Sequence, residues 1–304
     1  MPLSKPIPVV LDTDVGTDID DTWAIAMMLR SPELNVRLIT TATQDTTYRA
    51  TLVAKQLEMA GRTDVPIGIG IREPDKPAAP GWEYRIAGWV KDYNLKKFPG
   101  TIRQDGVAAM IEVLMNSPEP VTLISIAPLP NVAAALDREP RIAPRTRFVG
   151  MHGSVRRGYG GLQQIDAEYN VKNNVPAARK VFTAPWKEMT ITPLDTCGIV
   201  SLQGRRYQTI RQSQDPAVRA VIESYQIWLK GQPDEGRTST LFDTVAIYLA
   251  FATARLRMEK LRIRITDEGK MVEDPAAPLV NAAMDWTDLE GYYDFLTARL
   301  LGQA

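Results

Sequence analysis

The sequence has one cysteine, one histidine and no excess charge of either sign, because 36 lysines and arginines balance 36 aspartates and glutamates among 304 residues. The single Cys197 excludes an internal disulfide and a thiolate metal cluster, and we expect it to pack as a small core hydrophobe in a reducing compartment. The balanced charge argues against nucleic-acid binding through a broad basic surface. No apolar run approaches the roughly 18 residues of a membrane span, and the first predicted strand leaves no room for a signal peptide, so we expect a cytoplasmic protein without a membrane partner.

An acidic run directly follows an apolar one near the start of the chain. Residues 7–11 are typical of a buried strand, and the segment Asp12-Thr-Asp-Val-Gly-Thr-Asp-Ile-Asp-Asp21 then brings five carboxylates together. Residues 23–29 predict a short helix that ends before Ser31-Pro32. Helix N-termini favour aspartate, but this explains one or two of the five. Because close carboxylates repel one another in a partly desolvated site, the run predicts a metal centre.

Strand-like and helix-like segments alternate over the first two thirds of the chain. We expect further strands at 38–42, 65–69, 121–126 and 148–151, and helices at 48–60, 106–115 and 131–136. This alternation predicts a single α/β domain, residues 1–304, with a mostly parallel, doubly wound sheet flanked by helices. Such sheets bind ligands at the C-terminal ends of their strands, where the acidic run is expected. Surface loops are predicted at 72–82 and 156–161, and the glycine-rich 158–161 segment is a candidate lid.

Two other protein classes begin with a similar acidic segment. Haloacid-dehalogenase phosphatases have Asp-x-Asp-Gly-Thr after a strand, but Val15 breaks this spacing and the pair Asp20-Asp21 would have no role. An EF-hand loop starting at Asp12 would require glycine in place of Thr17 and glutamate in place of Trp23. Both interpretations leave most of the acidic run unexplained.

The acidic run resembles the Asp-Thr-Asp-Pro-Gly-x-Asp-Asp signature of the inosine-uridine preferring nucleoside hydrolase family, with two more residues before the paired aspartates. The resemblance continues in register over almost the full chain. The other matching segments are Leu38-Ile-Thr-Thr-Ala-Thr-Gln-Asp45, Ala60-Gly-Arg-Thr-Asp-Val-Pro-Ile67, Ile126-Ala-Pro-Leu-Pro-Asn131, Met151-His-Gly153, Ala167-Glu-Tyr-Asn170 and Phe242-Asp-Thr-Val-Ala246. It implies hydrolysis of the N-glycosidic bond of a nucleoside or related small-molecule riboside around one Ca²⁺, and a homodimer or homotetramer.

Carried over residue by residue, the resemblance implies four protein ligands for Ca²⁺. They are Asp14, Asp21, the carbonyl oxygen of Ile126, and Asp243. An all-oxygen set suits Ca²⁺, which takes roughly six to eight oxygen ligands, and water and ribose hydroxyls would complete it. Asp14 is also implied as the catalytic base that takes a proton from the water held by the cation. The surrounding carboxylates would stabilise an oxocarbenium-like ribosyl group.

Two aspartates of the run, Asp12 and Asp18, are given neither a metal nor a sugar contact by this comparison. Asp18 lies in the segment that is two residues longer than the family signature. We expect it to cap the following helix rather than to bind the metal. Asp12 is expected to orient the loop through hydrogen bonds.

The same resemblance implies that Asp20, Asp45, Glu168 and Asn170 bind the sugar hydroxyls. Asp45 stands where asparagine is commoner, and its extra negative charge would suit a cationic or differently substituted ligand. Met151 and His152 lie at a strand end that faces the site in the family, so we predict that both contact the substrate. A substitute acid, a sugar contact and a packed core histidine all stay open for His152.

The histidine with which the family protonates the leaving base is absent. Phe242 stands directly before Asp243 in its place, and a phenyl ring cannot donate a proton. Aromatic stacking is another way to hold a base or other substrate group, and the candidates are Trp82, Tyr159, Tyr225, Trp228 and Phe242. Three functions stay open: nucleoside hydrolysis, hydrolysis of another ribosyl or carbohydrate-derived compound, and non-hydrolytic sugar or nucleoside binding with Ca²⁺ on the same scaffold. The intact base and side-chain ligands favour hydrolysis.

Overall fold

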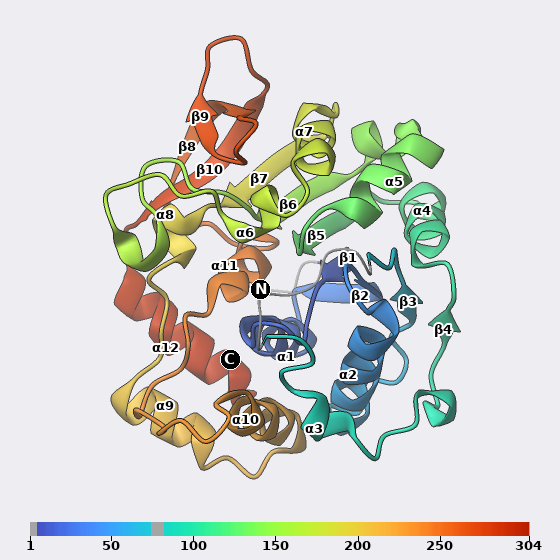
Figure 1. Ribbon diagram of the computed structural model, residues 1–304, viewed down its shortest axis with the longest axis vertical. Coiled ribbons are helices and arrows are strands. Elements are labelled where there is room, and N and C mark those ends of the chain that lie inside the picture. The colour runs from blue at the N-terminus through green and yellow to red at the C-terminus, as the bar shows by residue number, and fades with distance from the viewer. Residues whose placement is uncertain (1–4, 74–81, 304) are drawn as a thin grey trace.

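A computed structural model describes residues 5–73 and 82–303 of the chain. Its strands form one sheet in the order β4-β3-β2-β1-β5-β6-β7-β10-β8-β9. Helices cover both faces of this sheet (Figure 1). The strands are β1 (Ile7–Thr13), β2 (Leu34–Thr41), β3 (Ile67–Ile69), β4 (Ile102–Arg103), β5 (Thr122–Ile126), β6 (Arg147–Met151), β7 (Glu188–Thr192), β8 (Leu256–Ile265), β9 (Met271–Glu273) and β10 (Leu279–Trp286). Strands β1 to β7 are parallel and β10 continues this direction beside β7, whereas β8 runs antiparallel to both β10 and β9.

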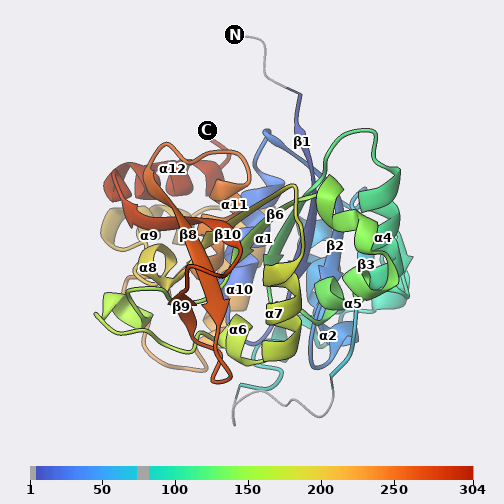
Figure 2. The same cartoon turned by 90° about the horizontal axis from the view of Figure 1, so that it is seen from above.

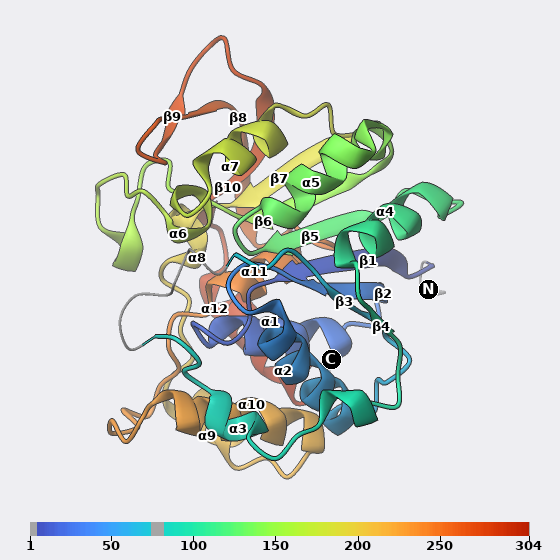
Figure 3. The same ribbon diagram turned by 45° about the vertical axis from the view of Figure 1, so that its right-hand side comes forward.

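The helices form two layers that enclose the sheet, as Figure 3 shows. In chain order they are α1 (Asp20–Leu29), α2 (Thr46–Met59), α3 (Ala87–Val90), α4 (Gly106–Asn116), α5 (Pro130–Arg138), α6 (Tyr169–Lys172), α7 (Val175–Thr183), α8 (Leu194–Cys197), α9 (Gly204–Arg211), α10 (Pro216–Trp228), α11 (Phe242–Leu249) and α12 (Leu289–Leu300). One apolar cluster joins the sheet to α1, α2, α10, α11 and α12, and a second joins it to α4, α5 and α7. Strand β1 is buried between these layers, as expected for a central parallel strand.

The predicted α/β class is confirmed, and all nine predicted elements are present. Their ends differ by a few residues; the largest differences are that α1 begins at Asp20 rather than at residue 23 and β2 at Leu34 rather than at residue 38. Cys197 is fully buried, as expected of a core residue. Residues 74–81 of the predicted 72–82 loop lie outside the described residues. In the described part of the chain, no helix has the length and apolar character required to cross a bilayer.

The strand order reverses at the centre of the sheet. From β1 the chain proceeds outward through β2, β3 and β4, then returns to the other side of β1 with β5 and continues through β6 and β7. Thr13 and Ile126, the last residues of β1 and β5, are paired at this point. A reversal of this kind leaves a crevice beyond the carboxyl ends of the two strands, which is where open α/β sheets bind ligands. The acidic run leaves β1 at this position, so the topology places it there.

Buried Asn131 at the start of α5 links the chain segments around the reversal. Its Nδ2 donates to Asp12 Oδ1 at 2.8 Å and to the carbonyl oxygen of Thr41 at 3.0 Å, and its Oδ1 accepts from Ile71 N at 2.8 Å. The side chain therefore ties β1, β2 and the segment after β3 to one helix N-terminus.

We expect Asn131→Ala to lower the free energy of unfolding by about 3 kcal/mol, because buried partners that lose a hydrogen bond each cost about 1–3 kcal/mol. Denaturant unfolding measures this. The exposed Asn116→Ala at the end of α4 is the control and should change stability by less than about 0.5 kcal/mol. Equal stability of the two variants would contradict the linking role of Asn131.

Candidate active site

A cavity of about 280 Å³ opens at the carboxyl ends of β1, β5 and β6. One part of its lining consists of carboxylates together with the Met151 thioether and the Asn170 amide. Aromatic rings form the other part. The lining residues are Asp14, Thr17, Asp18, Asp20, Asp21, Trp82, Ile126, Met151, Tyr159, Glu168, Tyr169, Asn170, Phe242 and Asp243. Residues far apart in the sequence, from the acidic run to α11, thus meet around one space.

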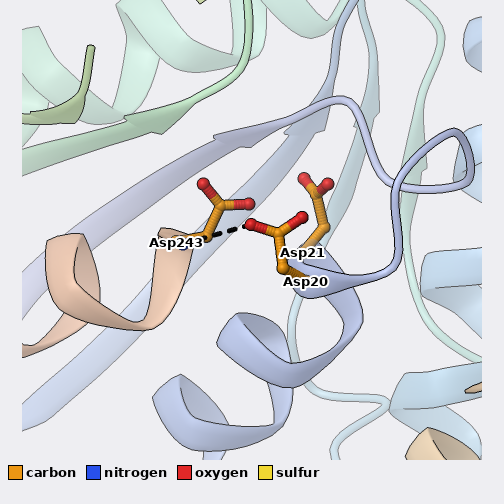
Figure 4. Close-up of side chains that lie close together, drawn as sticks. All are labelled: Asp20, Asp21 and Asp243. Carbon is orange, nitrogen blue, oxygen red and sulfur yellow. Dashed lines mark hydrogen bonds between the residues drawn. The ribbon is translucent and has the colours of Figure 1, made fainter. Parts of the chain in front are cut away.

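Three carboxylates converge in the acidic part of the cavity (Figure 4). One oxygen each of Asp20, Asp21 and Asp243 lies within 4.8 Å of the others, and all three side chains are buried. Asp20 and Asp21 form the first turn of α1, and Asp243 belongs to the first turn of α11, which packs beside α1. Asp243 N donates to Asp20 Oδ2 at 3.2 Å. Two helix N-termini therefore direct their positive dipole ends at the carboxylates, which favours negative charge there.

The helix dipoles do not offset the free-energy cost of burying several carboxylates of the same charge close together. Desolvation, followed by repulsion from neighbouring aspartates, raises the pKa values of Asp20, Asp21 and Asp243 well above the usual range of aspartate. Thr13 Oγ1 donates a hydrogen bond to Asp21 and counters only part of this. A bound divalent cation would remove both the repulsion and the need for protons, and three converging carboxylate oxygens are the donors that a hard cation prefers.

Asp14 lines the same cavity but is not part of the group of three oxygens. Burial raises its pKa to about 6, and the nearby Arg49 guanidinium partly opposes this. Arg49 is buried on α2, and its Nη1 donates to the carbonyl oxygens of Asp14 and Val15. Its Nε donates to the carbonyl oxygen of Thr43 at 3.1 Å, and its Nη2 donates to the side chain of Gln44 at 2.9 Å. One buried cation thus ties the backbone of the acidic run to the segment between β2 and α2.

The structure places Asp12 outside the cavity lining and gives it hydrogen-bonding partners. Its Oδ1 accepts from Thr40 Oγ1 at 2.6 Å and from Asn131, as predicted for a residue that orients the loop, and burial raises its pKa to about 7. The predicted helix cap by Asp18 is wrong. Helix α1 has Ile19 at its N-cap without a side-chain cap, and Asp18 accepts from Ile19 N at 2.7 Å while lining the cavity.

Glu168 and Asn170 form a hydrogen-bonded edge of the cavity. Glu168 caps α6 and accepts hydrogen bonds from Gly153 N at 2.9 Å, Asn170 N at 2.6 Å and Val171 N. Burial nevertheless raises the pKa of Glu168 to about 7. Asn170 Nδ2 donates to the carbonyl oxygen of Met151 at 3.0 Å. With Met151 and Ile126 also lining the cavity, four predicted site residues lie together here.

Two predicted substrate contacts lie elsewhere. Asp45 is the N-cap of α2, accepting from Thr47 N and Tyr48 N, and the Tyr84 hydroxyl donates to its other oxygen at 3.0 Å. It is not among the cavity-lining residues. His152 is fully buried, with Nε2 3.1 Å from the carbonyl oxygen of Ala127 and its ring against aromatic core residues. Burial lowers its pKa to about 4, which opposes a role as an acid, and the buried ring has no exposed atom for a sugar contact. The structure therefore supports the packed-core alternative for His152.

The aromatic part of the cavity contains three of the five predicted candidates, namely Trp82, Tyr159 and Phe242. Trp228 does not line it; its Nε1 donates to the carbonyl oxygen of Thr17 at 3.3 Å and its ring stacks on Tyr225. Sequence reasoning missed Tyr169, although it stands between the predicted contacts Glu168 and Asn170. It also missed Arg49, because a single arginine within a predicted helix gives no sign in the sequence that it binds the acidic run.

The chain matches the family model described as inosine-uridine preferring nucleoside hydrolase over residues 9–291. It belongs to that family. The non-specific ribonucleoside hydrolase RihC of Escherichia fergusonii is 35% identical over 184 residues, which is 58% of each chain. RihC of Escherichia coli strain K12 is 34% identical over 187 residues, again 58% of each chain. The chain thus spans a little over half the length of the curated relatives that it matches.

Solved structures of nucleoside hydrolases share the fold over nearly the whole chain. The plant nucleoside hydrolase PpNRh1 has a TM-score of 0.82 at 21% identity, covering 98% of this chain and 99% of its own. The purine-preferring ribonucleoside hydrolase of Gardnerella vaginalis has a TM-score of 0.79 at 18% identity, with 97% and 99% covered. At these identities the comparison establishes the α/β architecture of the family.

The raised carboxyl pKa values predict an unusual pH dependence of stability. Asp12, Asp14 and Glu168 have folded-state pKa values of about 6–7 against ordinary values near 4, so without a cation the folded state binds more protons than the unfolded state. Stability should therefore fall as the pH rises from about 4 to about 7. A divalent cation should reverse this, because it favours the ionised carboxylates.

Thermal unfolding at about pH 5 and about pH 8, in chelator and with added divalent cation, measures the effect. We expect the chelated protein to melt lower at the higher pH and the cation to raise the melting temperature more there. The same cation effect at both pH values would contradict the prediction.

Proposed function

We propose that this chain binds one Ca²⁺ in the acidic part of the cavity and hydrolyses the N-glycosidic bond of a ribonucleoside or related riboside. Family membership supports the reaction class. The single observation that carries the site assignment is the convergence of Asp20, Asp21 and Asp243, three buried carboxylates with raised pKa values, at the sheet reversal. Such a cluster is stable in ionised form when a cation neutralises it.

Asp21, Asp243, Asp14 and the carbonyl oxygen of Ile126 would hold the cation, and Asp20 lies close enough to Asp243 to take part. All of these donors are oxygens, which suits Ca²⁺ better than the softer transition metals. When bound, the cation supplies positive charge that makes a water molecule more acidic and neutralises the carboxylates.

The chain's own groups supply the rest of the chemistry. Asp14, with a pKa raised toward neutrality, is suited to accept the proton of the attacking water. Asn170 and Glu168 present amide and carboxylate groups on a hydrogen-bonded edge where ribose hydroxyls would be oriented. The negative charge of the acidic part would stabilise the positive charge that develops on the ribosyl group as the bond to the base breaks.

Ribose release from inosine, uridine and p-nitrophenyl riboside tests the reaction. We expect Asp14→Asn to keep the fold and to lower kcat by about 10²–10⁴-fold, because the amide cannot accept the proton of water. Circular dichroism checks the fold of the variant. Equal turnover by Asp14→Asn would remove Asp14 from the mechanism, and a wild-type protein that binds these ribosides without releasing ribose would be a binding protein.

Calorimetric titration with Ca²⁺ tests the metal ligands. We expect Asp243→Ala to weaken Ca²⁺ binding at least about 100-fold, since even residues that only support a ligand cost about 10–100-fold. Asp137→Ala, which removes an exposed carboxylate paired with Lys180, is the control and should bind Ca²⁺ as the wild type does. Normal Ca²⁺ binding by Asp243→Ala would contradict the assignment.

A further inference from the structure

The aromatic part of the cavity contains a hydroxyl group next to the phenyl ring that replaces the family's proton donor. The ring of Tyr159 meets that of Phe242 edge to face, with centroids 6.0 Å apart and planes at 86°. Both residues line the cavity. Resting on the proposed function, we propose that the Tyr159 hydroxyl donates a hydrogen bond to the departing base and so supplies leaving-group stabilisation that Phe242 cannot.

The hydroxyl of Tyr159 has its acceptor side occupied and its proton available. Tyr169 N donates to the Tyr159 oxygen at 3.1 Å, which fixes the oxygen position. No described residue accepts a hydrogen bond from that hydroxyl. Partial burial raises its pKa above the usual tyrosine value although the residue is 40% exposed, so the group is a neutral donor near neutral pH. The proton is therefore available to a group bound in the cavity that Tyr159 lines.

The other ring side chains of the cavity are less suited to this task. Phe242 has no polar atom, and Trp82 packs against Trp228 with the Arg85 guanidinium 4.4 Å from its ring centre. The Tyr169 side chain interacts with Asn173 and follows directly after Glu168, on the sugar-binding edge. Tyr159 alone among the four combines contact with Phe242 and a fixed hydroxyl oxygen.

The loop that carries Tyr159 is anchored at its base. Buried Asp195 on α8 accepts hydrogen bonds from the backbone N–H groups of Val155, Arg156 and Arg157, at 2.8–3.0 Å. The Arg156 guanidinium also pairs with a glutamate on β8 and one on β9.

The tip of the loop has its own hydrogen bonds. Tyr159 N donates to Asp166 Oδ2 at 2.9 Å, and Asp166 N donates to Ser154 Oγ at 3.0 Å. Gly160 and Gly161 have φ values of 67° and 78°, which let the chain turn sharply after Tyr159. The loop therefore holds the Tyr159 ring at the cavity, as pre-organised donation requires.

The chemistry balances without a further reactant. As the bond between C1′ and the base nitrogen breaks, its electron pair stays on the base, and the Tyr159 O–H hydrogen bond stabilises the charge that develops there. Water gives its oxygen and one hydrogen to C1′. Its other proton passes through Asp14 and solvent to the base, so that ribose and the neutral base are formed while Tyr159 keeps its own proton.

The test compares Tyr159→Phe with the wild type on inosine, whose base needs stabilisation as it leaves, and on p-nitrophenyl riboside, whose leaving group needs little. Phenylalanine keeps the ring contact with Phe242 and removes only the hydroxyl. We expect kcat on inosine to fall about 100-fold with KM little changed, because one donor to a developing anion contributes about 10²–10³-fold. Turnover of p-nitrophenyl riboside should change less than about threefold.

The control is Tyr93→Phe, which removes a hydroxyl that is hydrogen-bonded to Glu58 and does not line the cavity, and it should leave both turnover rates unchanged. Equal losses on both substrates would mean a structural role through Tyr169 and would overturn the inference. So would unchanged turnover of inosine by Tyr159→Phe, or a wild type that hydrolyses only p-nitrophenyl riboside. A wild type that hydrolyses neither substrate would instead reject the proposed function.

Discussion

Burial of mutually repelling carboxylates at one point of the sheet is the constraint on which the rest of the site depends. Asp14, Asp20, Asp21 and Asp243 lie in a region where desolvation and repulsion both oppose their ionised forms. The fold concentrates its available compensation there, with two helix N-termini, the Arg49 guanidinium and the hydroxyl of Thr13. These groups hold the carboxylates in place but leave them short of positive charge. Under the proposed function, this deficit would favour the binding of a cation, and it would also stabilise a substrate that becomes positive as it reacts.

The architecture was predictable because periodicity is a local property of the sequence. Buried strands such as residues 7–11 and the helices between them are recognisable one at a time, and the parallel order follows from their alternation. The antiparallel strand β8 and its neighbours β9 and β10 belong to the last third of the chain (Figure 2), for which the sequence pattern predicted no strand. The position of the acidic run followed from the sheet, since the reversal beside β1 defines where ligands bind.

Contacts between distant residues were not predictable in the same way. Whether Asp45 faces the sugar or caps α2 depends on where the helix begins, and a shift of one or two residues decides it. His152 follows a site-facing methionine, but successive side chains of a strand point to opposite faces, so it enters the core while Met151 lines the cavity. Asp18 is one residue too early to cap α1. Arg49 acquires its role only through partners that lie up to 35 positions away along the chain.

The position of Asp243 also matters for how the protein is made. Asp20 and Asp21 are synthesised before Asp243, which is hydrogen-bonded to Asp20 and follows 223 positions later. At about 5–20 residues per second, synthesis separates the two by roughly 10–45 s. The nascent chain therefore carries an incomplete cluster during that interval. The packing of α11 against α1 and a site with all three carboxylates become possible only after Asp243 has been made, so a cation held by the three would be captured after the two helices meet.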